Sequence, residues 1–326
     1  MLTGEISSRV QTCSTGRIET AQRLLKPCRP RETCPGVEGS PMGTERITSF
    51  TRDGLIFDVH DAGPVEGTPV FLLHGFPQDS RSWDAVSPLL HTRGYRTVAP
   101  DQRGYSPGAR PRTRRAYRPS QLTEDIIALI EVAGLGPVHL VGHDWGAAVA
   151  WEVAAQRPDL LRSLTALSVP HPAAFLRAML TSSQVLRSRY MFFFQLPWLP
   201  ERALSSGKSW ERSLHSTGMS WEAAARDAES MQDRGAARGA LNWYRAMMFS
   251  SPRALRTRIT VPTLYVWSDG DTAIGPQGAA LTPRFVTGPY TYEVLEGVSH
   301  WIPDEAAEQL DAMLARHFDT LPASGS

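Results

Sequence analysis

Cysteine is almost missing from this chain of 326 residues, because Cys13, Cys28 and Cys34 are its only three and all of them precede residue 35. The part of the chain that follows cannot form a disulfide bond within itself, which favours a reducing, cytoplasmic location. The three cysteines include no CxxC pair and have no histidine nearby, so the pattern does not favour a zinc site.

Long apolar runs are missing as well. No stretch reaches the roughly 18 apolar residues of a membrane-spanning helix, so we expect no membrane span. A secretory signal needs about 7 to 15 apolar residues behind a basic start, and Glu5, Arg9 and Arg17 interrupt any such run. The formal net charge is only +1, which gives no electrostatic reason to expect a nucleic acid or an anionic membrane as partner.

The first 42 residues have no sustained apolar period and are rich in Thr, Ser, Arg, Pro and Gly. This composition predicts a disordered N-terminal extension over residues 1–42. Because a regular pattern begins just after Met42, we expect the natural start of the chain to lie close to that residue.

After this extension, short apolar runs typical of strands alternate with helical patterns. Such alternation indicates an α/β fold with a mostly parallel sheet and helices on both faces. Strands are expected at residues 70–73, 96–99, 138–141, 164–169, 260–267 and 291–295. Helices are expected at residues 82–90, 122–132, 147–155 and 304–318.

The alternation stops between residues 171 and 255, where several helical segments rich in Arg, Ala, Met, Trp and Phe follow one another. Strands resume afterwards, so these helices interrupt one sheet. We therefore expect a core of residues 43–170 and 256–322, with an α-helical cap, or lid, inserted over residues 171–255.

One tight turn carries the strongest chemical signal. Gly142, Asp144 and Gly146 stand between an expected strand and a helix of small residues, the context of the turn that presents a nucleophile in α/β-hydrolase folds. Glycine on both sides leaves room for a strained, exposed central residue. An Asp that only caps the helix is the alternative. Since the other parts of a catalytic set follow in the required order, we predict that Asp144 is the nucleophile.

Those other parts are an acid and a histidine in the last third of the chain. His300 follows the last expected strand, and Asp269 and Asp271 follow the strand before it. We favour Asp271, because it stands farther past the strand end and can reach back toward the histidine, but Asp269 remains open. The same fold forms an oxyanion hole from two backbone amides, which here belong to Phe76 and Trp145.

Four motifs in this sequence together carry a resemblance to a known family. His74 to Pro77, Asp101 to Gly104, Gly142 to Gly146 and His300 with Trp301 are similar to motifs of the α/β-hydrolase-fold epoxide hydrolases, over nearly everything after residue 42. The resemblance implies two cap tyrosines that hold the epoxide oxygen. The segments around Tyr190 and Tyr244 resemble those that bear them.

The expected chemistry follows from the carboxylate. Attack by Asp144 on an epoxide carbon would give an alkyl ester, and His300 supported by Asp271 would then activate a water to hydrolyse it. This cycle needs no metal and no organic cofactor. We expect Pro77, Phe194 and Trp301 to contact the substrate, a small apolar epoxide.

Three other functions compete with this prediction. A haloalkane dehalogenase shares the Asp and His, but the motif that such enzymes usually resemble is His-Gly-Asn-Pro, with Asn at the position of Phe76. A non-catalytic receptor of the same fold would usually have lost one member of the catalytic set. A serine esterase is the weakest, since the turn holds Asp144 in place of serine. The apolar cap residues fit a substrate tunnel and a cap core equally well, and the oligomeric state, monomer or homodimer, stays open.

Overall fold

The computed structural model describes residues 45–250 and 257–320, all within one compact unit. The predicted N-terminal extension over 1–42, Met42 and the three cysteines lie outside the described residues.

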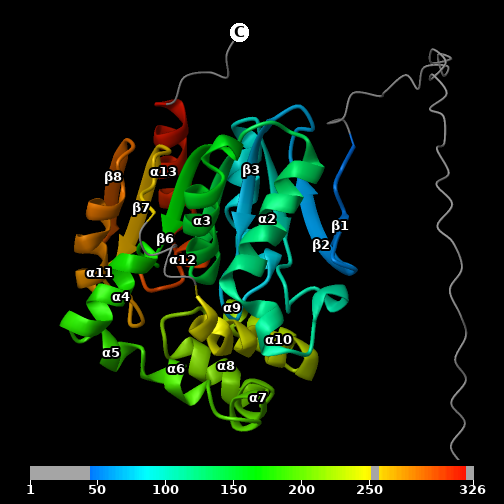
Figure 1. The fold of residues 1–326 in the computed structure, drawn as a ribbon, viewed down its shortest axis with the longest axis vertical. Coiled ribbons are helices and arrows are strands. Elements are labelled where there is room, and N and C mark those ends of the chain that lie inside the picture. Colours follow the sequence, from blue (N-terminus) through cyan, green and yellow to red (C-terminus); the bar gives the residue numbers. More distant parts are fainter. Residues whose placement is uncertain (1–44, 251–256, 321–326) are drawn as a thin grey trace, which may run out of the picture. The chain divides into compact units, whose positions relative to one another are not determined.

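The described residues form eight strands, which join one sheet in the order β1-β2-β4-β3-β5-β6-β7-β8 (Figure 1). The strands are β1 (Ser49–Arg52), β2 (Leu55–Ala62), β3 (Thr68–Leu73), β4 (Tyr95–Pro100), β5 (Val138–His143), β6 (Leu161–Leu167), β7 (Thr263–Ser268) and β8 (Tyr290–Leu295). β1 and β2, and β2 and β4, run antiparallel. Every pairing from β4 to β8 is parallel, so the predicted mostly parallel sheet is confirmed.

Helices cover both faces of this sheet (Figure 1). One face packs on α2 (Pro119–Ala133), α3 (Trp145–Gln156) and α11 (Pro276–Leu281), and the other on α1 (Ser87–Thr92), α12 (Ile302–Glu305) and α13 (Ala307–Asp319). Neighbouring residues of a strand point to opposite faces. Phe71 of β3 accordingly packs with the first group and Leu72 with the second, and both are fully buried. Burial on both sides explains why the strands read as continuous apolar runs.

Two expected helices are broken in the structure. In place of one helix over residues 82–90, a 3₁₀ turn spans Ser80–Trp83 and α1 begins at Ser87. Pro88 is the reason, because proline has no N–H and its ring would clash with the carbonyl four residues earlier in a continuous helix. The expected helix over 304–318 is divided into α12 and α13 at Ala306, whose φ of −129° is not helical.

A helical region is inserted between β6 and β7, as expected for the cap. It consists of α4 (Pro172–Thr181), α5 (Gln184–Arg187), α6 (Arg189–Phe193), α7 (Leu199–Leu204), α8 (Lys208–His215), α9 (Trp221–Ser230) and α10 (Arg234–Ala246). We call α4 to α10 the cap. Its helices lie at the end of the sheet where β5 and β7 finish (Figure 1). The indole N–H of Trp243 on α10 donates to the backbone oxygen of Arg103 at 2.7 Å, which is a hydrogen bond between the cap and the core.

Candidate active site

Asp144 lies at the tight turn between β5 and α3, in a conformation that side chains rarely adopt. Its φ is 51° and its ψ is −119°. The turn is packed so closely that an added Cβ on Gly142 would lie 2.3 Å from the oxygen of Gly146, and one on Gly146 would lie 2.1 Å from the oxygen of Leu73. Only glycine fits at those two positions. The closely packed turn keeps Asp144 in its strained backbone conformation and places its carboxylate at the start of α3, where the helix dipole favours negative charge.

His300 connects two carboxylates. Its Nδ1 lies 2.7 Å from Oδ2 of Asp271, and its Nε2 lies 3.5 Å from Oδ2 of Asp144. The second oxygen of Asp271 accepts hydrogen bonds from the amides of Ala273 and Ile274, at 2.7 and 2.8 Å. The structure therefore brings Asp144, His300 and Asp271 together from three separate loops.

Asp269, the alternative acid, does not approach His300. Its Oδ1 accepts a hydrogen bond from the amide of Gly297 at 2.7 Å, and its side chain is exposed. Asp269 thus orders the loop after β8, and the geometry leaves Asp271 as the acid beside the histidine.

The charges of this group reinforce one another. Burial opposes a charge on His300, but the neighbouring carboxylates of Asp271 and Asp144 outweigh it and raise the pKa of His300 to about 10. Burial also opposes a charge on Asp144, yet the hydrogen bond and charge of His300 and the amide of Phe76 hold the pKa of this carboxyl below its usual value. The resting protein therefore contains an Asp144 carboxylate beside a His300 imidazolium.

The two expected backbone donors stand on either side of Asp144. The amide of Phe76 donates to Oδ1 of Asp144 at 2.8 Å. The amide of Trp145 is at the first position of α3, where backbone N–H groups have no acceptor within the helix. An added Cβ on Gly75 would lie 2.4 Å from Cβ of Asp144, so glycine is required for this approach.

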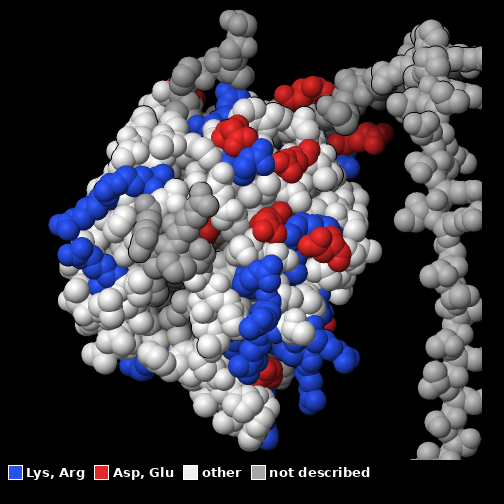
Figure 2. Space-filling view, viewed as in Figure 1, with Lys and Arg blue, Asp and Glu red and all other residues white. Residues whose placement is uncertain are grey.

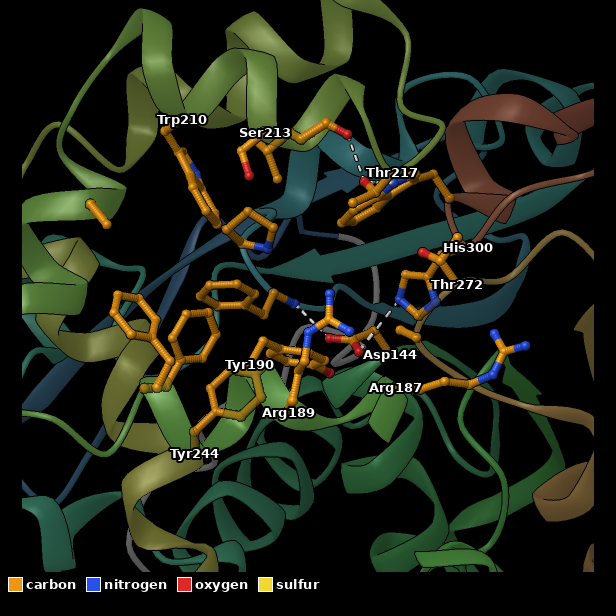
Figure 3. Close-up of a pocket in the computed structure, with 18 of the residues that line it drawn as sticks. Asp144, Arg187, Arg189, Tyr190, Trp210, Ser213, Thr217, Tyr244, Thr272 and His300 are labelled. Atoms are coloured by element: carbon orange, nitrogen blue, oxygen red, sulfur yellow. Dashed lines mark hydrogen bonds and ion pairs between the residues drawn. The ribbon is translucent and has the colours of Figure 1, made fainter. Parts of the chain in front are cut away.

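Both cap tyrosines reach the same place. Tyr190 on α6 and Tyr244 on α10 line the cavity that contains Asp144 and His300, and their ring centroids are 5.9 Å apart (Figure 3). Burial raises the pKa of the Tyr190 phenol, and nearby Asp144 raises it further. Burial raises the pKa of Tyr244 in the same way. Both phenols therefore stay protonated.

The cavity has a volume of about 1130 Å³ and is mostly apolar. Pro77, Phe194 and Trp301, the predicted substrate contacts, all line it. Trp210 lies across the cavity from the two tyrosines (Figure 3). Among residues 45–250 and 257–320, no three His, Cys, Asp or Glu side chains are grouped so that they could hold a metal ion.

Several supporting residues escaped sequence reasoning. Nη1 of Arg187 donates to the backbone oxygen of Asp271 at 2.9 Å, and the side-chain amide of Gln184 bonds to the backbone of Ala273 and Gly275 at 2.7 and 2.8 Å. These α5 residues hold the loop that carries the acid. Their distance along the chain leaves no local signal. His143 does have a local signal, because it directly precedes Asp144. Its Nε2 lies 2.9 Å from the backbone oxygen of His300.

Comparisons with known proteins show the family of this fold. Residues 68–307 match the family model described as alpha/beta hydrolase fold. The chain is 35% identical to the AB hydrolase superfamily protein YfhM of Bacillus subtilis, over 78% of this chain and 91% of that protein. It is 30% identical to human epoxide hydrolase 4, over 90% of this chain and 84% of the relative.

Among solved structures, an epoxide hydrolase from hot-environment metagenomes superimposes with a TM-score of 0.72 at 29% identity, over 85% of this chain and 99% of that one. An epoxide hydrolase from Vigna radiata gives a TM-score of 0.71 at 27% identity, over 87% of this chain and 100% of that one.

Proposed function

Because this chain belongs to the α/β-hydrolase family and is similar to epoxide hydrolases over most of its length, we propose that it adds water to a small apolar epoxide and releases a vicinal diol. The observation that carries the proposal is that one cavity contains a carboxylate, Asp144, and two phenols, Tyr190 and Tyr244. A carboxylate attacking an ester would form a reactive anhydride, whereas at a saturated carbon it forms an ordinary ester. The phenols supply the proton donors that an opening epoxide oxygen needs.

In the first step, Oδ2 of Asp144 attacks an epoxide carbon. A bond forms between them, the carbon–oxygen bond of the ring breaks, and its electron pair moves to the epoxide oxygen. That oxygen takes a proton from Tyr190 or Tyr244, which enter the reaction protonated. Oδ1 of Asp144 keeps its hydrogen bond from the amide of Phe76 and becomes the carbonyl oxygen of the ester.

Ester formation also prepares the base for the second step. The ester has no charge, so one of the two carboxylates that raise the pKa of His300 has disappeared. The pKa of His300 then falls, and the imidazolium passes its proton to the tyrosinate left by ring opening. This restores the phenol and leaves His300 as a neutral base. Asp271 remains beside Nδ1 and keeps the ring oriented.

In the second step, His300 takes a proton from water, and the resulting hydroxide attacks the carbonyl carbon. The oxyanion develops on Oδ1, where the amides of Phe76 and Trp145 stabilise it. The bond between this carbon and the ester oxygen breaks, and the leaving oxygen takes its proton from His300. The regenerated carboxylic acid of Asp144 gives its proton to His300, which restores the carboxylate and the imidazolium of the resting protein, so one water is consumed for each diol.

Trapping the ester tests the proposal directly. A His300→Gln variant incubated with styrene oxide should accumulate an adduct, seen by mass spectrometry on the peptide that contains Asp144. An Asp144→Asn, His300→Gln double variant is the matched control and should remain unmodified. If the single variant acquires no adduct while the wild type forms diol, water attacks the epoxide directly and the covalent mechanism is wrong.

The origin of the diol oxygen gives a second readout. In a single turnover in water enriched in oxygen-18, the label should enter the Asp144 carboxylate and leave the first diol unlabelled. Label in the first diol would contradict the mechanism.

A further inference from the structure

Large apolar side chains are exposed on one part of the cap. Sixteen large hydrophobic residues are exposed within the described ranges, and nine of them fall between residues 176 and 199. Single exposed apolar residues are ordinary, but a contiguous group marks a binding surface. We call this group the outer cap face: Leu176, Leu180, Val185, Leu186, Phe192, Phe193, Leu196, Trp198 and Leu199.

The most exposed members of the outer cap face are leucines and aromatic residues, which proteins usually bury. Leu180 is 78% exposed, Leu186 67%, Trp198 66% and Phe192 61%. They belong to α4, α5 and α6 and to the start of α7, which follow one another along the cap (Figure 1). Helix α4 contacts α5, and α5 contacts α6. The outer cap face is therefore built from short consecutive helices.

Charge on this part of the chain has one sign. No Asp or Glu occurs between Asp159 and Glu201. Arg177 and Arg189 lie in the same interval, are exposed, and form no ion pair with an acidic side chain of the described residues. Arg189 also lines the cavity. Arg187 is exposed too, but it is held by its hydrogen bond to the backbone of Asp271. In Figure 2 the lower left of the surface, where Figure 1 shows α4 to α6, is white with scattered blue and no red. A net charge of +1 for the whole chain conceals this local excess.

From the apolar and basic character together we propose that the outer cap face docks on the surface of an anionic lipid bilayer. Leu, Phe and Trp side chains insert at the boundary between headgroups and acyl chains, while arginines meet anionic headgroups. A second copy of this chain is a poorer occupant, because a two-fold symmetric contact brings together two faces that carry the same sign of charge. Within the described residues no helix is long and apolar enough to cross a membrane.

The cavity opens on the same face. Leu186, Phe193 and Leu199 are exposed members of the outer cap face and also line the cavity that contains Asp144. A docked molecule would present this opening to the lipid. On the proposed function, an apolar epoxide dissolved in the bilayer would then reach Asp144 without first passing into water, whereas docking itself does not depend on that function.

The test is sedimentation of the full chain with vesicles. Vesicles of equal parts phosphatidylcholine and phosphatidylglycerol should carry the wild-type protein into the pellet, more than vesicles of phosphatidylcholine alone, and high salt should weaken the binding. A triple variant, Leu180→Ser, Phe192→Ser and Trp198→Asn, should lower the partition coefficient by about tenfold or more. Arg177→Gln should lower it about fivefold. None of these four residues lines the cavity.

Matched controls come from other exposed positions. Val132 on α2 is 63% exposed, and Arg316 on α13 is also exposed. Val132→Ser and Arg316→Gln should leave vesicle binding unchanged. Circular dichroism and thermal melting of the triple variant should match those of the wild type, because the substituted side chains are exposed.

Three results would overturn the proposal. The wild type could stay in the supernatant with anionic vesicles, or the triple variant could sediment as well as the wild type. Light scattering could also show a dimer that the triple variant abolishes, which would assign the face to a second copy. Diol formation from styrene oxide in buffer, measured without vesicles, reports separately on the proposed function. The triple variant should retain that activity.

Discussion

The amide of Phe76 donates a hydrogen bond of 2.8 Å to Oδ1 of Asp144, although 68 residues separate the two in sequence. The contact depends on β3 and β5 lying side by side in parallel, since Phe76 follows the first strand and Asp144 the second. The sheet thus holds a donor against the acid that we propose as nucleophile before any substrate arrives. Such preorganised donors are worth about 100 to 1,000-fold each in rate.

Gly75→Ala should disrupt this contact. The new Cβ would lie 2.4 Å from Cβ of Asp144, so either the carboxylate or the Phe76 amide must move. We expect kcat/KM for diol formation to fall by about 100-fold or more. Gly235→Ala at the start of α10 is the control and should have little effect on kcat/KM, because Gly235 does not line the cavity. The nearest atom to its added Cβ is Oδ1 of the capping Asp233, which at 3.1 Å would have to shift by only a few tenths of an ångström. Wild-type kinetics for Gly75→Ala would show that the approach is not needed.

Substitution of Asp271 and of Asp269, the two acids that follow β7, should have very different effects on kcat. Asp271→Asn removes the charge beside Nδ1 and should reduce kcat by about 100-fold or more, mainly in ester hydrolysis. Asp269→Asn should leave kcat nearly unchanged, because that side chain binds the amide of Gly297. Single-turnover kinetics with styrene oxide would measure both steps. The reverse order of effects would exchange the roles of the two acids.

Removing the phenols should affect epoxides specifically. Tyr190→Phe and Tyr244→Phe should each lower kcat about tenfold or more, and the double variant by roughly 100 to 10,000-fold, the usual range for a proton donor. Tyr292→Phe on β8 is the control and should match the wild type. Halide release from 1-bromoalkanes, measured in parallel, tests the dehalogenase alternative. Strong halide release that survives in the double variant would favour that alternative over the epoxide.

Protonation of His300 should make stability decrease as the pH rises. The pKa of histidine is about 6.5 in an unfolded chain, and in the folded protein it is raised to about 10. Between these values the folded protein retains a proton that the unfolded chain has released. The contribution of His300 to the free energy of unfolding is therefore complete below about pH 6.5 and lost toward about pH 10. By calorimetry, the Tm difference between the wild type and His300→Gln should shrink over this window; a constant difference would contradict the raised pKa.

A buried ion pair beneath the cap should be required for stability. Arg103 binds both oxygens of Asp125 at 2.7 Å, and both side chains are 3% exposed. Asp125→Ala would leave the guanidinium buried without its partner, at a cost of about 3 to 5 kcal/mol in the free energy of unfolding. Urea denaturation measures the difference. Asp159→Ala, which removes an exposed partner of Arg157, should produce no measurable change.

Much of this fold was accessible from the sequence because its signals are local. Buried strands of a doubly covered sheet read as apolar runs, and the predictions at residues 70–73 and 138–141 lie within β3 and β5. The prediction at residues 291–295 lies within β8, an edge strand that is mostly not buried. The order of Asp144, a late acid and His300 is also a property of the chain alone. Pro88 is also a local signal, and it indicates a helix that begins at residue 87 rather than one continuous helix over 82–90.

Other features depend on loops and on the packing of short helices. Choosing between Asp269 and Asp271 requires the path of the loop after β7, which residue types do not specify. The same limit applies to the apolar cap residues: Phe194 is buried beside Tyr244, whereas neighbouring Phe192 is 61% exposed. A five-residue helix such as α6 is too short for a periodic pattern to reveal its buried side.

Phe76 contributes two different things to the proposed active site. Its backbone amide meets Asp144, while its ring packs against the rings of Tyr244 and Phe194, with centroids 5.1 and 5.3 Å apart. Because the donor is main chain, the side chain at this position can vary without removing the hydrogen bond. Evolution or a protein engineer can therefore reshape the wall of the cavity at residue 76, and so change which epoxides fit, while the chemistry at Asp144 stays the same.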